Sequence, residues 1–335
     1  MKTGIAYFHT RDSRHFERDL DDMVEHGCNF VVHTFSELDL AYYNQSMEKI
    51  FRITKDRGLE VYADPWGFGG VYGGETFSRF VAENLQARQV TRDGRSVAAA
   101  CPNQPAFRAF QKQWIRRVAE MGADVCFWDE PHYHFNLMDP SSWENWTCRC
   151  PECLRLFKEV SGGEMPAEMT KEVELFRQQS LFDFLCENCR EAKSLGMRNA
   201  VCVLPDEDQG ALSRAAGTSS WDKIAAMPEV DIFGTDPYWV LFGGEVQEYV
   251  RKHCLAVKEL CVRYGKESQA WVQAFLIPEG REEEVRTAVK TIWDTGIKNI
   301  AAWAYRGAHL IDIRCSQPEK VWDILGKSYR KIRGF

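Results

Sequence analysis

Short runs of almost continuous apolar residues alternate with longer stretches in which apolar residues recur at helical spacing. The apolar runs are Gly4–His9, Asn29–Phe35, Leu59–Trp66, Ala123–Pro131, Asn199–Pro205, Val230–Trp239, Ser268–Ile277 and Ile297–Arg306. The amphipathic stretches are His15–His26, Met47–Arg57, Ala106–Met121, Glu172–Ser194, Glu245–Tyr264, Arg281–Asp294 and Pro318–Arg330. A run that is apolar throughout is typical of a parallel strand covered on both faces. The pattern therefore predicts eight strand–helix units.

Glycines close several amphipathic stretches, where a residue in the left-handed conformation ends a helix before the next strand begins. These glycines are Gly27, Gly58, Gly122, Gly196, Gly265 and Gly296. Eight such units without a low-complexity linker predict a single (β/α)8 barrel, the TIM-barrel fold, as one domain over residues 1–335. An open doubly wound sheet uses the same alternation, but no Gly-x-Gly-x-x-Gly sequence follows the first run.

Two connections are too long for simple loops. Gly67–Pro105 follows the third predicted strand and is rich in glycine, and His132–Pro166 follows the fourth and carries three cysteines. Both leave the carboxyl ends of strands, the face at which barrel enzymes build their sites. We expect the two connections to pack together over that face and to contribute to a functional site.

The composition of the chain argues against two classes of partner, nucleic acids and membranes. The chain has 42 Lys and Arg against 49 Asp and Glu, a net charge of −7, so it offers no basic stripe for a nucleic acid. No apolar run approaches the roughly 20 residues that span a bilayer, and we expect no membrane partner. These features favour a cytoplasmic protein, and a homo-oligomer is left open.

Four of the twelve cysteines are spaced like metal ligands. Cys148, Cys150 and Cys153 form Cys-x-Cys-x2-Cys in the second long connection, and Cys101 lies in the first. Four thiolates suit one tetrahedral Zn²⁺ with no open coordination position, so we expect the metal to be structural. The alternative is four reduced thiols.

The same segment resembles a known enzyme family. Cys101-Pro-Asn-Gln-Pro, an acid-bearing fourth strand and the Cys-x-Cys-x2-Cys loop occur here in the order found in the β-galactosidases of glycoside hydrolase family 42. The resemblance covers about residues 101–157 and implies a divergent, stand-alone glycosidase barrel. It also implies that Glu130, in Trp-Asp-Glu-Pro, is the general acid/base, with Asp129 where the family has Asn. The seventh strand carries Gln273 where the family's nucleophile is Glu.

A second carboxylate must therefore come from elsewhere. Three other strand ends offer one: Asp64, the Asp206–Glu207 pair, and Asp236. Asp236 is the preferred partner of Glu130, in either a retaining or an inverting arrangement. In another route, adjacent Asp129 and Glu130 resemble the hexosaminidases in which the substrate's acetamido group is the nucleophile.

Aromatic and polar residues near the strand ends complete the predicted site. Candidate substrate-binding residues are Asp64, Trp66, His33, Tyr238, Trp239, Trp271, Gln273, Trp303 and Arg306. Aromatic rings pack on the apolar faces of sugars, while polar groups bind their hydroxyls. The sequence thus predicts a glycoside hydrolase acting on a small glycoside or oligosaccharide. The alternatives are a non-catalytic carbohydrate-binding barrel and a sugar lyase or isomerase.

Overall fold

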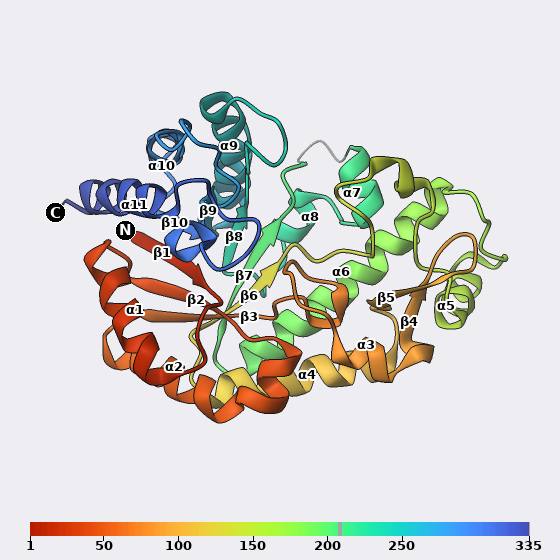
Figure 1. Cartoon of the computed structure of the whole chain (residues 1–335). Coiled ribbons are helices and arrows are strands. Elements are labelled where there is room, and N and C mark those ends of the chain that lie inside the picture. Colours follow the sequence, from red (N-terminus) through yellow and green to blue (C-terminus); the bar gives the residue numbers. More distant parts are fainter. Residues whose placement is uncertain (207–209, 335) are drawn as a thin grey trace.

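The computed structural model describes residues 1–206 and 210–334. Its parallel strands close into a barrel in the order β1-β10-β9-β8-β7-β6-β3-β2 (Figure 1). These strands are β1 (Lys2–Tyr7), β2 (Phe30–Thr34), β3 (Glu60–Asp64), β6 (Val125–Asp129), β7 (Arg198–Val203), β8 (Ile232–Thr235), β9 (Glu267–Gln273) and β10 (Asn299–Trp303). Each overlaps one apolar run, so the predicted (β/α)8 barrel is confirmed and the open sheet is wrong.

The longer helices match the amphipathic stretches and surround the barrel. They are α1 (Ser13–Glu25), α2 (Asn44–Asp56), α4 (Pro105–Glu120), α6 (Lys171–Ser194), α9 (Val246–Tyr264), α10 (Glu284–Asp294) and α11 (Pro318–Arg333). The remaining α-helices of the described residues, which the pattern did not predict, are α3 (Arg79–Glu83), α5 (Pro151–Ser161), α7 (Ala211–Ala216) and α8 (Trp221–Ala225). Within the described residues, no helix has the length and apolar character needed to cross a membrane.

Strand alternation divides the core into two layers. Tyr62, Phe127 and Trp271 belong to the cluster inside the barrel, whereas their chain neighbours Val61 and Trp128 pack outward against the helices. Because successive side chains of a strand point to opposite faces, parity along each strand decides which residues can reach the mouth, the carboxyl end of the barrel.

The two long connections form a lobe beside the barrel, to the right in Figure 1. We define the lobe as residues 75–101 and 132–161, which include α3, α5 and an antiparallel hairpin of β4 (Arg88–Val90) and β5 (Ser96–Ala100). The Arg92 N–H donates to the Trp146 carbonyl, and the Arg149 N–H donates to the Val90 carbonyl, each at 2.8 Å. The predicted packing of the two connections on one another is thus confirmed.

Candidate active site

Five carboxyl groups converge at the mouth of the barrel. Asp64 ends β3, Asp129 ends β6, Glu130 follows it, and Asp236 follows β8. Glu75 joins them from the connection after β3, and the charges of Glu75 and Asp129 both act on Asp64. Asp64 and Asp129 share strand parity with Tyr62 and Phe127, which places both on the inner face of the barrel.

The backbone at Glu130 brings two adjacent carboxylates to the same side. Consecutive strand residues point to opposite faces, but Glu130 has a φ of 44°, in the left-handed region. Its side chain consequently turns back to the mouth beside that of Asp129. A Cβ built on Gly73 would lie 2.4 Å from Asp129 Oδ2 and 3.5 Å from Glu130 Oε2, so both carboxylates approach this glycine.

Burial and mutual repulsion make the cluster hard to ionise. Burial is the main cause that raises the pKa of Asp64, Glu75, Asp129 and Asp236, and the neighbouring carboxylates raise each pKa further. Among the described residues, none of the five carboxylates forms a salt bridge with Lys, Arg or His. The cluster therefore retains protons at a pH at which isolated carboxyls have lost them.

Asp236 contacts Glu130 directly. The Asp236 pKa is raised first by burial, then by the charge of Glu130 and by a side-chain hydrogen bond with it. The neighbouring charge therefore favours the protonated form of Asp236.

Both ends of the Gln273 side-chain amide form hydrogen bonds with the backbone. Its Oε1 accepts from the Val240 N–H at 2.9 Å, and its Nε2 donates to the Phe275 carbonyl at 3.0 Å. The side chain is fully buried and fixes the loop after β8. At this strand end the chain thus has a structural amide in place of a carboxylate.

Several of the predicted aromatic residues lie at or below the mouth. Trp66 stacks on Phe8 at 5.3 Å between ring centroids, and its Nε1 donates to Glu75 at 2.9 Å. Trp303 also stacks on Phe8, at 5.7 Å between ring centroids. Tyr238 adjoins Asp236. Trp271 is only 1% exposed and donates to Gln269, so it forms the barrel core rather than a contact surface.

Three predicted binding residues face away from the mouth, which corrects that expectation for them. His33 points outward from β2 and contacts the Thr54 hydroxyl of α2 at 3.0 Å. Trp239 donates to Glu284 of α10 at 2.7 Å, and Arg306 pairs with Asp22 of α1 at 3.1 Å. The sequence placed them near strand ends, but their parity and loop conformation direct them into the helix layer.

The sequence missed Glu75 and Gly73 as site residues. Both lie in a glycine-rich stretch without regular structure, and the run Gly69-Gly70 to Gly73-Gly74 was the only available signal of close packing. Of the other predicted carboxylates, Asp206 accepts from the Gly210 and Ser213 N–H groups at the start of α7. Glu207 lies outside the described residues.

The four predicted metal ligands come together in the lobe. The sulfurs of Cys101, Cys148, Cys150 and Cys153 are buried, lie within 4.8 Å of one another and form no disulfide. The Asn103 amide donates to Cys153 Sγ at 3.3 Å. This group could hold a metal ion.

A buried arginine near the cysteine cluster fits a negatively charged metal centre. Arg177 is fully buried, and it donates to the backbone carbonyls of Thr147, Arg214 and Ala215. Within the described part of the chain it forms no salt bridge. Buried charges need compensation, and a divalent ion with four thiolates carries a net charge of −2.

Comparisons with known proteins show the fold. A scan of protein-family models and a search of curated proteins found no match. Among solved structures, the chain is similar to the PgaB (BpsB) glycoside hydrolase domain from Bordetella bronchiseptica, with a TM-score of 0.64, 13% identity, and coverage of 97% of this chain and 99% of that one. It is similar to the endo-1,4-β-mannanase from Rhizomucor miehei, with a TM-score of 0.61, 11% identity, and coverage of 100% and 95%. A GH5_18 protein from Streptomyces cattleya, in complex with Manβ1-4GlcNAc, has a TM-score of 0.63 at 12% identity over 99% and 81%. These barrels share the architecture of this chain.

Proposed function

We propose that this protein is a glycoside hydrolase in which Glu130 is the general acid. The observation that carries the proposal is the carboxylate cluster at the mouth, where Glu130 turns inward next to Asp129 and Asp236. Glu130 gives its proton to the glycosidic oxygen as the bond to the anomeric carbon breaks, and the leaving alcohol departs neutral. The glycosidase barrels among the structural neighbours and the family-42-like motif around Cys101 support this function.

Asp236 is the proposed second carboxylate. Burial and the charge of Glu130 raise its pKa and favour a proton on Asp236 in the free protein. When a sugar binds between the two carboxyls, Glu130 gives its proton to the glycosidic oxygen, and Asp236 is the anion that faces the positive charge at the anomeric carbon. A water molecule then bonds to that carbon and gives its proton back to the carboxylate pair, so that the hydrolysed sugar leaves with a new hydroxyl. Tyr238 and Trp66 then border the sugar ring, whereas Asp64 is fully buried beneath it and acts on the site through its neighbour Asp129.

The substrate-assisted route is the second candidate. Asp129 lies next to Glu130 on the inner face, where it can orient an acetamido group while Glu130 protonates the leaving oxygen. Gln273 favours this route over one that needs a carboxylate on β9, because its amide is bound to the backbone. A barrel that binds carbohydrate without cleaving it is the outcome if neither route operates.

The cysteine cluster is proposed to hold one structural Zn²⁺. All four positions of a tetrahedral ion would be filled by thiolates, so the metal has no open position for substrate. It lies in the lobe rather than among the carboxylates. No catalytic step depends on it.

The experiment is turnover by Glu130→Gln on substrates that differ in leaving group. General acid catalysis contributes about 10²–10⁴-fold, so we expect a loss of that order on unactivated glycosides. The loss should be much smaller on nitrophenyl glycosides, because their leaving groups need no proton. Asp236→Asn should slow both substrate types alike. Full activity of Glu130→Gln on an unactivated glycoside would refute the assignment.

A further inference from the structure

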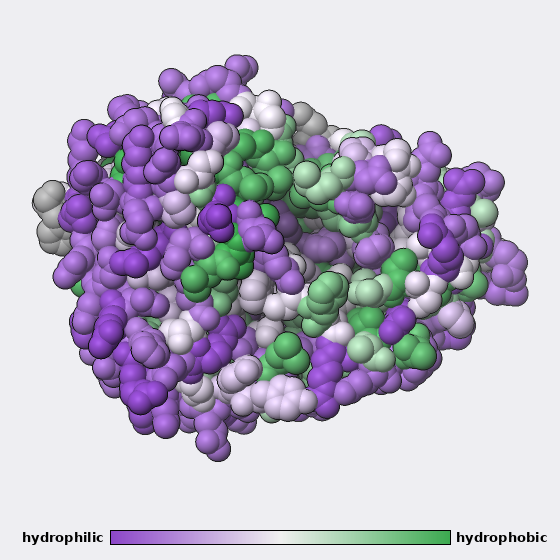
Figure 2. Space-filling view, viewed as in Figure 1, coloured by the Kyte–Doolittle hydropathy of each residue, from purple (hydrophilic) through white to green (hydrophobic). Residues whose placement is uncertain are grey.

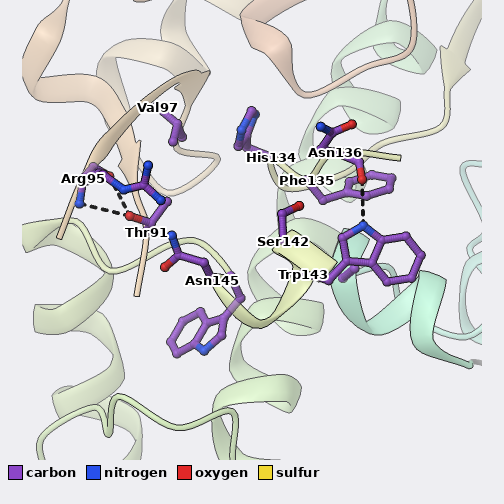
Figure 3. Close-up of a pocket in the computed structure, with 11 residues that line it drawn as sticks. Thr91, Arg95, Val97, His134, Phe135, Asn136, Ser142, Trp143 and Asn145 are labelled. Carbon is purple, nitrogen blue, oxygen red and sulfur yellow. Dashed lines mark hydrogen bonds between the residues drawn. The ribbon is translucent and has the colours of Figure 1, made fainter. Parts of the chain in front are cut away.

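The lobe contains a cavity separate from the carboxylate cluster. It has a volume of about 260 Å³ and opens between the β4–β5 hairpin and residues 134–146 (Figure 3). Its walls are Thr91, Arg95, Val97, His134, Phe135, Asn136, Ser142, Trp143, Asn145, Trp146 and Ala215. In Figure 3 Arg95, Thr91 and Val97 stand on one side, and Phe135, Asn136 and Trp143 on the other.

The walls combine an immobilised aromatic surface with exposed polar side chains. The Trp143 indole donates to the Asn136 carbonyl at 2.7 Å, and its ring lies 6.1 Å from that of Phe135, edge to face. These contacts fix the indole plane before a ligand arrives. His134 and Asn136 are exposed beside it. A flat apolar surface next to imidazole and amide groups suits a sugar ring, whose C–H face is apolar and whose rim carries hydroxyls.

Trp146 closes one wall of this cavity. The residue is 3% exposed, and its Nε1 has no hydrogen-bond acceptor among the described residues. This nitrogen is closed off from solvent, so the contribution of Trp146 to the cavity is the rest of its ring.

Aromatic rings lead from Glu130 to this cavity. The His132 Nδ1 contacts the Glu130 carbonyl at 2.5 Å, and its ring meets that of Phe135 at 5.4 Å. Phe135 in turn adjoins Trp143. Figure 2 shows the surface hollowed between the barrel and the lobe, with hydrophobic residues gathered at the rim. One extended ligand could therefore follow this path from the carboxylates to the lobe.

We propose that the lobe cavity is a second carbohydrate subsite, which binds one sugar unit of an oligosaccharide whose scissile bond lies at Glu130. The inference rests on the proposed function and specifies its substrate class: a chain of several sugars rather than a glycoside of a single sugar. Binding energy gained at Trp143 positions the distant bond for cleavage, so short substrates lose turnover as well as affinity.

The test compares substrate length in wild type and Trp143→Ala. The probes are nitrophenyl monoglycosides and manno-, cello- and chito-oligosaccharides of two to six units. For wild type we expect kcat/KM to rise by at least about tenfold with chain length, equivalent to about 1.4 kcal/mol. Trp143→Ala should abolish that rise and leave monoglycoside hydrolysis unchanged. Trp293→Ala, a half-buried tryptophan on α10 outside the cavity, is the matched control and should retain the rise.

The outcomes separate the two proposals. If monoglycosides are cleaved and chain length has no effect, the subsite is refuted while the proposed function stands. The same holds if Trp143→Ala slows monoglycosides as much as oligosaccharides. If no glycoside of any length is cleaved, the proposed function fails. In that case, oligosaccharide binding is measured by calorimetry. Binding to the wild type that is weakened in Trp143→Ala would still support the carbohydrate site in the lobe.

Discussion

Gly73 sets how closely the two central carboxylates approach the loop that covers them. Its N–H donates to the Asp129 carbonyl at 2.9 Å, and its Cα faces the carboxylates of Asp129 and Glu130. A methyl group at this position would overlap Asp129 Oδ2. Glycine is required at position 73 for lack of space for a side chain, because its backbone is not in the left-handed conformation.

We expect Gly73→Ala to lower turnover on the order of 100-fold, because small misplacements of catalytic groups have effects of that size. The loss of stability should stay within about 1–3 kcal/mol, the usual cost of overpacking. Kinetics and thermal unfolding of the same preparation measure both. Gly163→Ala is the control, since a Cβ there meets nothing within 4 Å. Equal activity of the two variants would show that Gly73 does not position the carboxylates.

At the residue scale, the sequence indicated which residues lie at the strand ends, but it did not indicate whether their side chains point into the barrel mouth or into the helix layer. The acid-bearing strand ends could be recognised because parallel strands present their carboxyl ends to one face. Whether a side chain reached that face depended on strand parity and on local turns, which separates Asp64 from His33. The φ of Glu130 has no signature in the sequence.

At the scale of helices and strands, the barrel strands could be predicted from the sequence because they are buried on both faces. A strand covered on both faces must be apolar at nearly every position, so its run stands out from the amphipathic helices. The β4–β5 hairpin and helices α3, α7 and α8 are three to six residues long, and they are held by contacts to distant segments. Short elements of this kind carry little periodicity of their own, which explains why they were not predicted.

The cysteine cluster connects the two walls of the lobe cavity. The hairpin runs directly into Cys101, and the wall that ends at Trp146 runs into Cys148. A metal ion bound by both segments would hold the walls at a fixed separation. The metal should therefore affect binding of long substrates more than the chemistry at Glu130.

We expect one zinc ion per chain, with four sulfur ligands at about 2.3 Å by X-ray absorption. Removing it with a chelator should weaken oligosaccharide hydrolysis and expose the lobe to proteolysis, with a smaller effect on nitrophenyl monoglycosides. Cys153→Ser should lose the metal, whereas Cys315→Ser, buried outside the cluster, should keep it. Protein purified with zinc that contains no metal would contradict the assignment.

At the scale of the whole molecule, the buried carboxylate cluster lowers the free energy of unfolding. Asp64 is fully buried, and neither carboxylate oxygen has a hydrogen-bond partner among the described residues. Burial, followed by the charge of Asp129, raises its pKa well above the ordinary value of an aspartate side chain. The folded chain must therefore either keep a proton on Asp64 or bury an uncompensated charge, and both alternatives disfavour folding at neutral pH.

Asp64→Asn should accordingly stabilise the protein in a pH-dependent way. Below the ordinary carboxyl pKa, Asp64 is protonated in the folded and unfolded states and imposes no penalty that depends on pH. As the pH rises above it, the unfolded chain loses this proton first, so the free energy of unfolding of wild type falls by up to about 1.4 kcal/mol per pH unit until the raised pKa is passed. The advantage of Asp64→Asn in urea unfolding should thus grow from about pH 4 to neutrality. Asp222→Asn, which removes an exposed pair with Arg263, should change stability by no more than about 1 kcal/mol. An advantage of Asp64→Asn that is the same at both pH values would mean that packing, and not the buried charge, limits the stability of this barrel.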